Sequence, residues 1–117
     1  MRNPDLKQGD IYLVDFSENS VGHEYQKKRP AIIIQSNLQI KKSNLVTIMP
    51  LSTKLDKALK EDILVEKDNN NLLLHDSVIK VQHIISFDPV RFSHKIGEVK
   101  KEVLSEIKNY LTKHFDL

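Results

Sequence analysis

Short apolar runs rich in β-branched residues dominate the first three quarters of the chain. They occupy residues 11–16, 31–35, 45–51, 62–67 and 77–85. Runs of this length and composition are typical of β-strands, and the continuous ones predict strands buried on both faces. The last two runs are separated by KDNNN, residues 67–71. Asn and Asp favour tight turns, so we expect a hairpin across this segment.

The end of the chain has a different period. Apolar residues recur three or four positions apart, with Lys and Glu between them, at Val103, Leu104, Ile107, Tyr110, Leu111 and Phe115. This spacing predicts an amphipathic helix of about four turns from near Lys100, packed against the sheet. Asp88 followed by Pro89 suits an N-cap and a first-turn proline, which predicts a short helical turn at residues 88–92.

The order of these elements predicts a mainly β fold. Strands followed by one long helix favour a small curled sheet or barrel closed by that helix and the short turn. The length of 117 residues suits one compact domain, residues 1–117. Charged residues make up 29% and hydrophobic residues 39%, which is typical of a globular chain rather than a disordered one.

Composition excludes several classes of site and location. The chain has no Cys, which excludes disulfides and thiolate metal sites. Residues 1–10 lack the apolar segment of a signal peptide, and no apolar run approaches the length of a membrane span. We therefore expect a cytoplasmic protein. Residues 1–60 carry ten Lys or Arg against six Asp or Glu, whereas residues 61–117 carry eight against ten. An imbalance of this size carries weight only if the functional surface lies in the first half.

The first candidate cluster is the polar segment 22–29, GHEYQKKR, which ends at Pro30. The proline ring favours an extended conformation for the preceding Arg29, which predicts a guanidinium with a defined direction. Such an arginine can bind a phosphate with two donors. His23 could transfer protons near neutral pH, and Glu24 could accept one. The same residues also fit a solvated turn with a surface ion pair.

The second candidate cluster is PLSTK, residues 50–54. Ser52 and Thr53 end an apolar strand and could hold a phosphoryl oxygen, with Lys54 adding positive charge. They also fit a local turn or helix cap. His83 lies within an apolar run, where a lone histidine is more often a structural group than a catalytic one, although its two ring nitrogens allow either role.

Metal and nucleotide sites are not expected. His75, His94 and His114 lack metal-ligand spacing, and the chain has no HExxH motif, Asp-rich calcium loop, GxGxxG motif or P-loop. We therefore expect no metal and no cofactor.

Taken in this order, the two clusters and the segments around them resemble the MazF/PemK (Kid) family of toxin endoribonucleases. The resemblance is carried by residues 9–16, 22–34, 46–53 and 76–88 and by the C-terminal helix. Its most specific part is G-x-E-x-x-x-x-R-P before an aliphatic strand, with P-L-S-T downstream. The family implies an SH3-like β-barrel and a homodimer. It also implies metal-independent cleavage of single-stranded mRNA and neutralisation by an antitoxin with a disordered tail.

The resemblance also implies roles for individual residues. Arg29 matches a catalytic arginine, and Ser52 stands where the family usually has a catalytic threonine. Glu24 and His23 are alternative bases for the 2′-OH of RNA, whose attack would leave a 2′,3′-cyclic phosphate and a 5′-OH end. The expected RNA contacts are Tyr25, Lys27, Lys28, Thr53, Lys54, Lys80, Gln82 and His83.

The late strand departs from the family pattern. Relatives carry an acidic residue or glutamine followed by an arginine there, whereas this chain has Gln82, His83 and Ile85. The aspartate and arginine of PemK-type members fall at Gln82 and Lys80, so the proton acceptor is lost and only the positive charge is kept. Two alternatives follow. One is a CcdB-like toxin that acts on gyrase through protein contacts, and the other is a catalytically impaired RNA-binding member.

Overall fold

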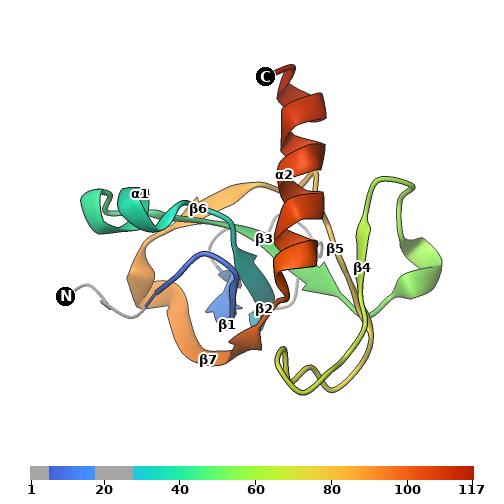
Figure 1. The fold of residues 1–117 in the computed structure, drawn as a ribbon. Helices are drawn as coiled ribbons and strands as arrows, with labels where there is room; N and C mark the ends of the chain where they lie inside the picture. The colour runs from blue at the N-terminus through green and yellow to red at the C-terminus, as the bar shows by residue number, and fades with distance from the viewer. Residues whose placement is uncertain (1–5, 18–27) are drawn as a thin grey trace.

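The strands form one antiparallel sheet with a C-terminal helix packed on it (Figure 1). The computed structural model describes residues 6–17 and 28–117. Within them the strand order is β4-β5-β3-β2-β1-β7, with β6 also paired to β3. The strands are β1 (Asp10–Asp15), β2 (Lys28–Ile33), β3 (Val46–Ser52), β4 (Ile63–Val65), β5 (Ser77–Ile79), β6 (Ile85–Phe87) and β7 (Phe92–Glu98).

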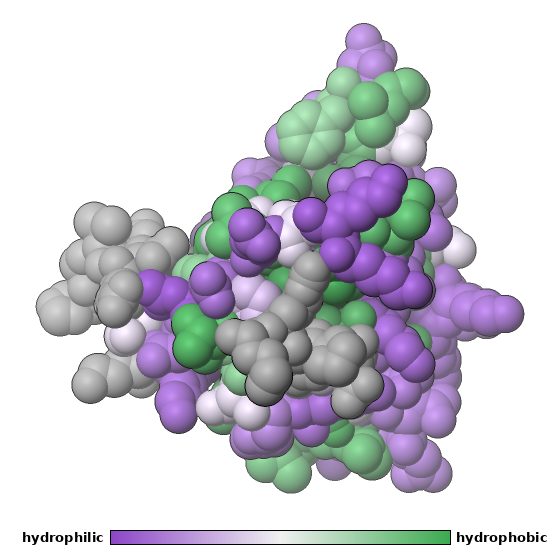
Figure 2. Space-filling view, turned by 90° about the vertical axis from the view of Figure 1, so that its left-hand side faces the viewer, coloured by the Kyte–Doolittle hydropathy of each residue, from purple (hydrophilic) through white to green (hydrophobic). Residues whose placement is uncertain are grey.

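Helical elements connect and cover the strands. α2 (Lys101–Phe115) is the long C-terminal helix, and α1 (Asn37–Lys42) joins β2 to β3. The 3-10 turns η2 (Leu55–Lys57) and η3 (Pro89–Arg91) lie in connections. The end of α2 projects beyond the body of the molecule (Figure 1), and Figure 2 shows apolar surface on this projection. Phe115, the last residue of α2, and Leu117 are both exposed. No helix in the described part of the chain has the length and apolar character needed to cross a membrane.

Each face of the sheet carries an apolar cluster because successive strand residues point to opposite sides. The helix face is the side on which α2 packs. Its buried residues are Ile11, Ile32, Met49, Leu51, Ile63, Val65, Ile79, Val81 and Ile107. The far face is the opposite side. Its buried cluster consists of Leu6, Tyr12, Val14, Phe16, Ala31, Ile33, Ile40, Val46, Ile48 and Phe87.

Most of the elements predicted from the apolar pattern are confirmed. The first, third and fourth predicted strands correspond to β1, β3 and β4 within a few residues, and α2 begins at Lys101. Asp88 caps η3 as predicted, because its side chain accepts a hydrogen bond from Val90 N at 2.9 Å. β2 begins at Lys28, three residues before the predicted start at Ala31, so Arg29 lies inside a strand.

The prediction of one strand across residues 77–85 is wrong. β5 and β6 both pair with β3, but Ile79 lies opposite Leu51 and Ile85 lies opposite Ile48. Residues 80–84 thus separate the two pairs on the late segment, whereas only residues 49 and 50 separate them on β3. The excess forms a turn in which His83 N donates to Lys80 O at 3.0 Å. An insertion of this kind interrupts a ladder and changes the direction of its side chains.

The sheet is not closed into a barrel. In the described residues β4 and β7 are its two ends, and no pairing joins them. The predicted barrel closure is therefore not confirmed, whereas the mainly β sheet with a C-terminal helix is. β7 escaped prediction because Ser93, His94 and Lys95 interrupt it with exposed polar side chains. α1 escaped prediction because six residues are too few to show a helical period.

The predicted hairpin is present with a longer connection. Val65 of β4 lies opposite Ser77 of β5, and residues 66–76 join them. This loop contacts β7, since Glu98 N donates to Asn70 O at 3.0 Å. A Cβ added at Gly97 would collide with the backbone carbonyl of Asn71. The loop therefore depends on a residue without a side chain at Gly97.

We expect Gly97→Ala to destabilise the fold. The added methyl group would displace backbone rather than a flexible side chain, and such overpacking typically lowers the free energy of unfolding by about 1–3 kcal/mol. Urea denaturation measures this loss. Ser93→Ala, at an exposed position of the same strand, is the control and should change little. An unchanged midpoint for Gly97→Ala would show that the loop does not rest on β7 in this way.

Candidate functional site

Arg29 is held in place by a strand on each side. It lies opposite Val14 of β1, and its Nη2 donates to Leu51 O of β3 at 3.1 Å. The side chain is half-buried on the far face. Burial lowers the pKa of the Arg29 guanidinium below its ordinary value. The defined direction predicted for this side chain is therefore present, although it arises inside β2 rather than before it.

The proline that follows explains why the guanidinium bonds to a strand carbonyl. Ile34 N donates to Thr47 O at 3.0 Å, and hydrogen-bonded pairs recur every second residue along an antiparallel ladder. Continued in register, this pattern puts Pro30 opposite Leu51. Proline has no N–H, so the Leu51 carbonyl lacks its ladder donor. The guanidinium of Arg29 supplies that donor.

Ser52 lies across from Arg29 at the end of β3. Ala31 pairs with Pro50, and two further residues along each strand bring Arg29 opposite Ser52 on the far face. Ser52 Oγ accepts a hydrogen bond from Lys54 N at 3.1 Å. This bond uses a lone pair and leaves the hydroxyl proton available for a phosphoryl oxygen. The structure therefore brings the two principal predicted site residues together on one face of neighbouring strands.

Lys80 lies on the same face, in the turn that interrupts the late strand. Its neighbours Ile79 and Val81 both pack under α2, so the side chain between them points to the far face. Lys80 Nζ lies 2.6 Å from Oδ2 of Asp62, which precedes β4. The side chain of Asp62 is 1% exposed and that of Lys80 is 17% exposed. The lysine predicted to contact RNA is thus held by a buried carboxylate.

The other predicted contact residues are distributed around this face. Gln82 and His83 are exposed in the turn after Lys80, outside the β3 ladder. Lys54 is exposed just before η2. Lys28 is exposed at the start of β2. Its Nζ lies 3.5 Å from Ser93 Oγ on β7, so it contacts a different strand from Arg29.

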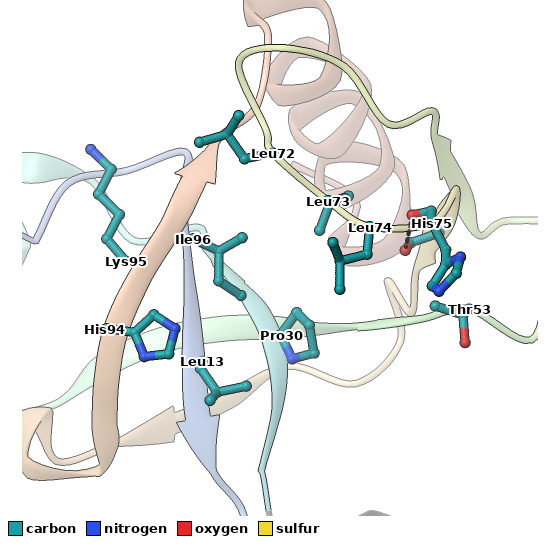
Figure 3. A pocket seen from close by; sticks show the side chains of 11 residues that line it. Leu13, Pro30, Thr53, Leu72, Leu73, Leu74, His75, His94, Lys95 and Ile96 are labelled. Carbon is teal, nitrogen blue, oxygen red and sulfur yellow. Dashed lines mark hydrogen bonds between the residues drawn. The ribbon is translucent and has the colours of Figure 1, made fainter.

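Thr53 borders a cavity on the helix face. The cavity has a volume of about 510 Å³. Figure 3 shows Pro30 and Ile96 reaching it from strands and Leu74 from the 66–76 loop. Its lining consists of Leu13, Pro30, Thr53, Leu72, Leu73, Leu74, His75, Ser77, His94, Lys95 and Ile96. Pro30 and Thr53 are the chain neighbours of Arg29 and Ser52, so the cavity lies behind the Arg29–Ser52 pair.

Four predicted site residues lie outside the described residues: His23, Glu24, Tyr25 and Lys27. The buried carboxylate of Asp62 was missed from the sequence. Nothing in the local pattern marks it, because its partner Lys80 is 18 residues away. Within residues 6–17 and 28–117, no group of three His, Asp or Glu side chains could hold a metal ion.

Comparison with known proteins gives one family from the sequence, and solved structures share the fold. Residues 7–115 match the model of the family described as PemK-like, MazF-like toxin of type II toxin–antitoxin system. A protein named Endoribonuclease MazF from Staphylococcus saprophyticus is 30% identical over 89% of this chain and 86% of its own. The crystal structure of MazF from Deinococcus radiodurans superposes with a TM-score of 0.77, at 19% identity, over 96% of this chain and 97% of that chain. An endoribonuclease in complex with its cognate antitoxin, from a mycobacterial species, superposes with a TM-score of 0.71, at 17% identity, over 96% and 94% of the two chains. The chain therefore belongs to the PemK-like, MazF-like toxin family of type II toxin–antitoxin systems.

Proposed function

We propose that this protein is an endoribonuclease toxin that cleaves single-stranded RNA at the Arg29–Ser52 pair. The observation that carries the proposal is the guanidinium of Arg29, held on the carbonyl of Leu51, the residue before Ser52. Two donors on one face suit the non-bridging oxygens of a phosphodiester. The family and the relative named as an endoribonuclease support the same activity.

Arg29 and Ser52 stabilise the negative charge that develops on the phosphoryl group. Partial burial removes water from the guanidinium and strengthens its attraction to an anion. The lowered pKa makes the Arg29 guanidinium a somewhat better proton donor, but an arginine stays protonated at neutral pH. We therefore assign it charge stabilisation. Ser52 donates its hydroxyl proton to a second oxygen.

The nucleophile comes from the substrate. A base removes the 2′-OH proton, the 2′ oxygen attacks the adjacent phosphorus in line, and the bond to the 5′ oxygen breaks. The leaving 5′ oxygen takes up a proton from water, and the base later returns its proton to solvent, which leaves 2′,3′-cyclic phosphate and 5′-OH ends. Glu24 or His23 is the proposed base. The scheme uses no metal ion.

RNA contacts and partners follow from the same assignment. Lys54 and Lys80 add positive charge near the hydroxyl, and Tyr25 is a proposed platform for a stacked base. A cognate antitoxin with a disordered tail would cover this surface. The positive first half of the chain suits an acidic tail. We also propose a homodimer, and an SH3-like curl for the open sheet.

The test is cleavage of a long RNA by the purified protein in EDTA. We expect fragments with 2′,3′-cyclic phosphate and 5′-OH ends, detected by mass spectrometry. An all-deoxy oligonucleotide of the same sequence should bind and stay intact because it lacks the 2′-OH. Cleavage of the deoxy strand, or a strict need for added Mg²⁺, would contradict the scheme. Intact RNA together with gyrase inhibition would favour a CcdB-like toxin.

A further inference from the structure

We propose that Asp62 is a positioning residue that holds the Lys80 ammonium on the face of the sheet carrying Arg29 and Ser52. The inference rests on the proposed ribonuclease function and extends it to a carboxylate in another strand segment. Asp62 itself would not touch the RNA, since its side chain is 1% exposed. It would act through Lys80.

Lys80 lies close to Ser52 in the sheet. Ser52 pairs with Val78, and Lys80 N donates to Pro50 O at 2.9 Å, so Lys80 lies one strand from Ser52 and two residues along. Arg29 approaches from the opposite side, on β2. Lys80 and Arg29 therefore lie on the two strands that neighbour Ser52, one on each side of β3.

The Asp62 carboxylate holds the Lys80 ammonium. Ile63 of β4 lies opposite Ile79 of β5, which brings Asp62 beside Lys80. Asp62 Oδ2 accepts hydrogen bonds from Lys80 Nζ at 2.6 Å and from Leu59 N at 2.9 Å. The carboxylate is thus fixed by backbone as well as by its partner.

The Asp62–Lys80 pair differs in energy from an exposed ion pair. A buried carboxylate is costly unless it is paired, so the pair is strongly favoured over its separated state. A free lysine samples many rotamers, and ordering it at the moment of reaction costs entropy. An ammonium has three donors, and one bond to Asp62 leaves two for phosphoryl oxygens. Asp62 therefore orders the cation in advance of the substrate.

This arrangement separates binding from catalysis. The negative charge of Asp62 opposes RNA binding, whereas its hold on Lys80 favours the reaction. We therefore expect Asp62→Asn to lower the single-turnover cleavage rate by roughly 10- to 100-fold, as for other misplaced groups. Its affinity for an all-deoxy analogue should be unchanged or tighter. Asp56→Asn, which removes the same charge at an exposed site in η2, should alter neither quantity by more than about twofold.

A double-mutant cycle with Lys80→Met gives the second readout. If Asp62 acts through Lys80, the effect of Asp62→Asn on the rate should disappear in the Lys80→Met background. Thermal melts of each variant give the folded fraction, which corrects the rates. Should Asp62→Asn fail to fold, Asp62→Glu keeps the charge and moves the carboxylate by one methylene. The rate should then fall while deoxy-analogue affinity is kept.

Several results would overturn the proposal. A rise in the cleavage rate of Asp62→Asn would mean that Asp62 keeps Lys80 away from RNA. Equal losses of rate and affinity, or a rate loss accounted for by unfolding, would mean a structural role only. An effect that persists in the Lys80→Met background, or no effect of Asp62→Glu, would also overturn it. The cleavage rate of the parent protein is measured first. If the parent cleaves no RNA, the proposed function itself is refuted.

Discussion

Arg29→Ala is expected to lower the single-turnover rate of RNA cleavage by about 10²- to 10³-fold, the usual effect of removing one donor to a developing oxyanion. The reason is the loss of a guanidinium that Leu51 O and the flanking strands hold in one direction. The rate of fragment formation from a short fluorescent RNA measures the effect.

Two comparisons make this result specific. Arg29→Lys keeps the charge but loses the planar fork, so its rate should fall between parent and Arg29→Ala. Arg29→Ala also leaves the Leu51 carbonyl without its donor, which costs about 1–3 kcal/mol of stability. Melting curves therefore accompany the rates. A folded Arg29→Ala protein that cleaves within a few-fold of the parent would remove Arg29 from the chemistry.

Ser52→Ala is expected to have the second largest effect, a decrease of about 10²-fold in the cleavage rate. The variant loses the hydroxyl on the face of the sheet that carries Arg29, and the backbone pairing of Ser52 with Val78 should be kept. Ser52→Thr restores a hydroxyl at the same Cβ and should cleave at close to the parent rate. Ser86→Ala removes an exposed hydroxyl from β6 and is the matched control. Equal rates for Ser52→Ala and Ser52→Thr would show that the hydroxyl is not used.

The apolar pattern predicted the strands and the helix whose buried side chains are continuous or evenly spaced along the sequence. β1, β3 and α2 each present a continuous or periodic apolar surface to a cluster, and the pattern reports burial directly. The late strand was mispredicted because residues 80–84 continue an apolar run while the backbone turns. In β7 the polar side chains face solvent at a sheet edge, so no apolar pattern marks the strand.

The sequence indicated candidate site residues only where side-chain chemistry and a local sequence pattern coincide. Arg29 could be recognised as a site candidate because it precedes Pro30. The proline favours an extended backbone at Arg29 and removes one hydrogen-bond donor from the β-ladder. Ser52 could be recognised because it is a hydroxyl residue at the end of an apolar strand. The Asp62–Lys80 pair depends on a turn and on the pairing of β4 with β5, which no local pattern contains. The roles of Glu24 and His23 remain predictions.

Arg29 and Ser52 are proposed to act on one phosphate. A double-mutant cycle on the single-turnover rate, with Arg29→Lys and Ser52→Ala, tests it most directly. Groups that act as a unit are strongly non-additive, so the double variant should be little slower than the slower single variant. If the two effects simply multiply, the residues act independently, and the shared phosphate site is contradicted.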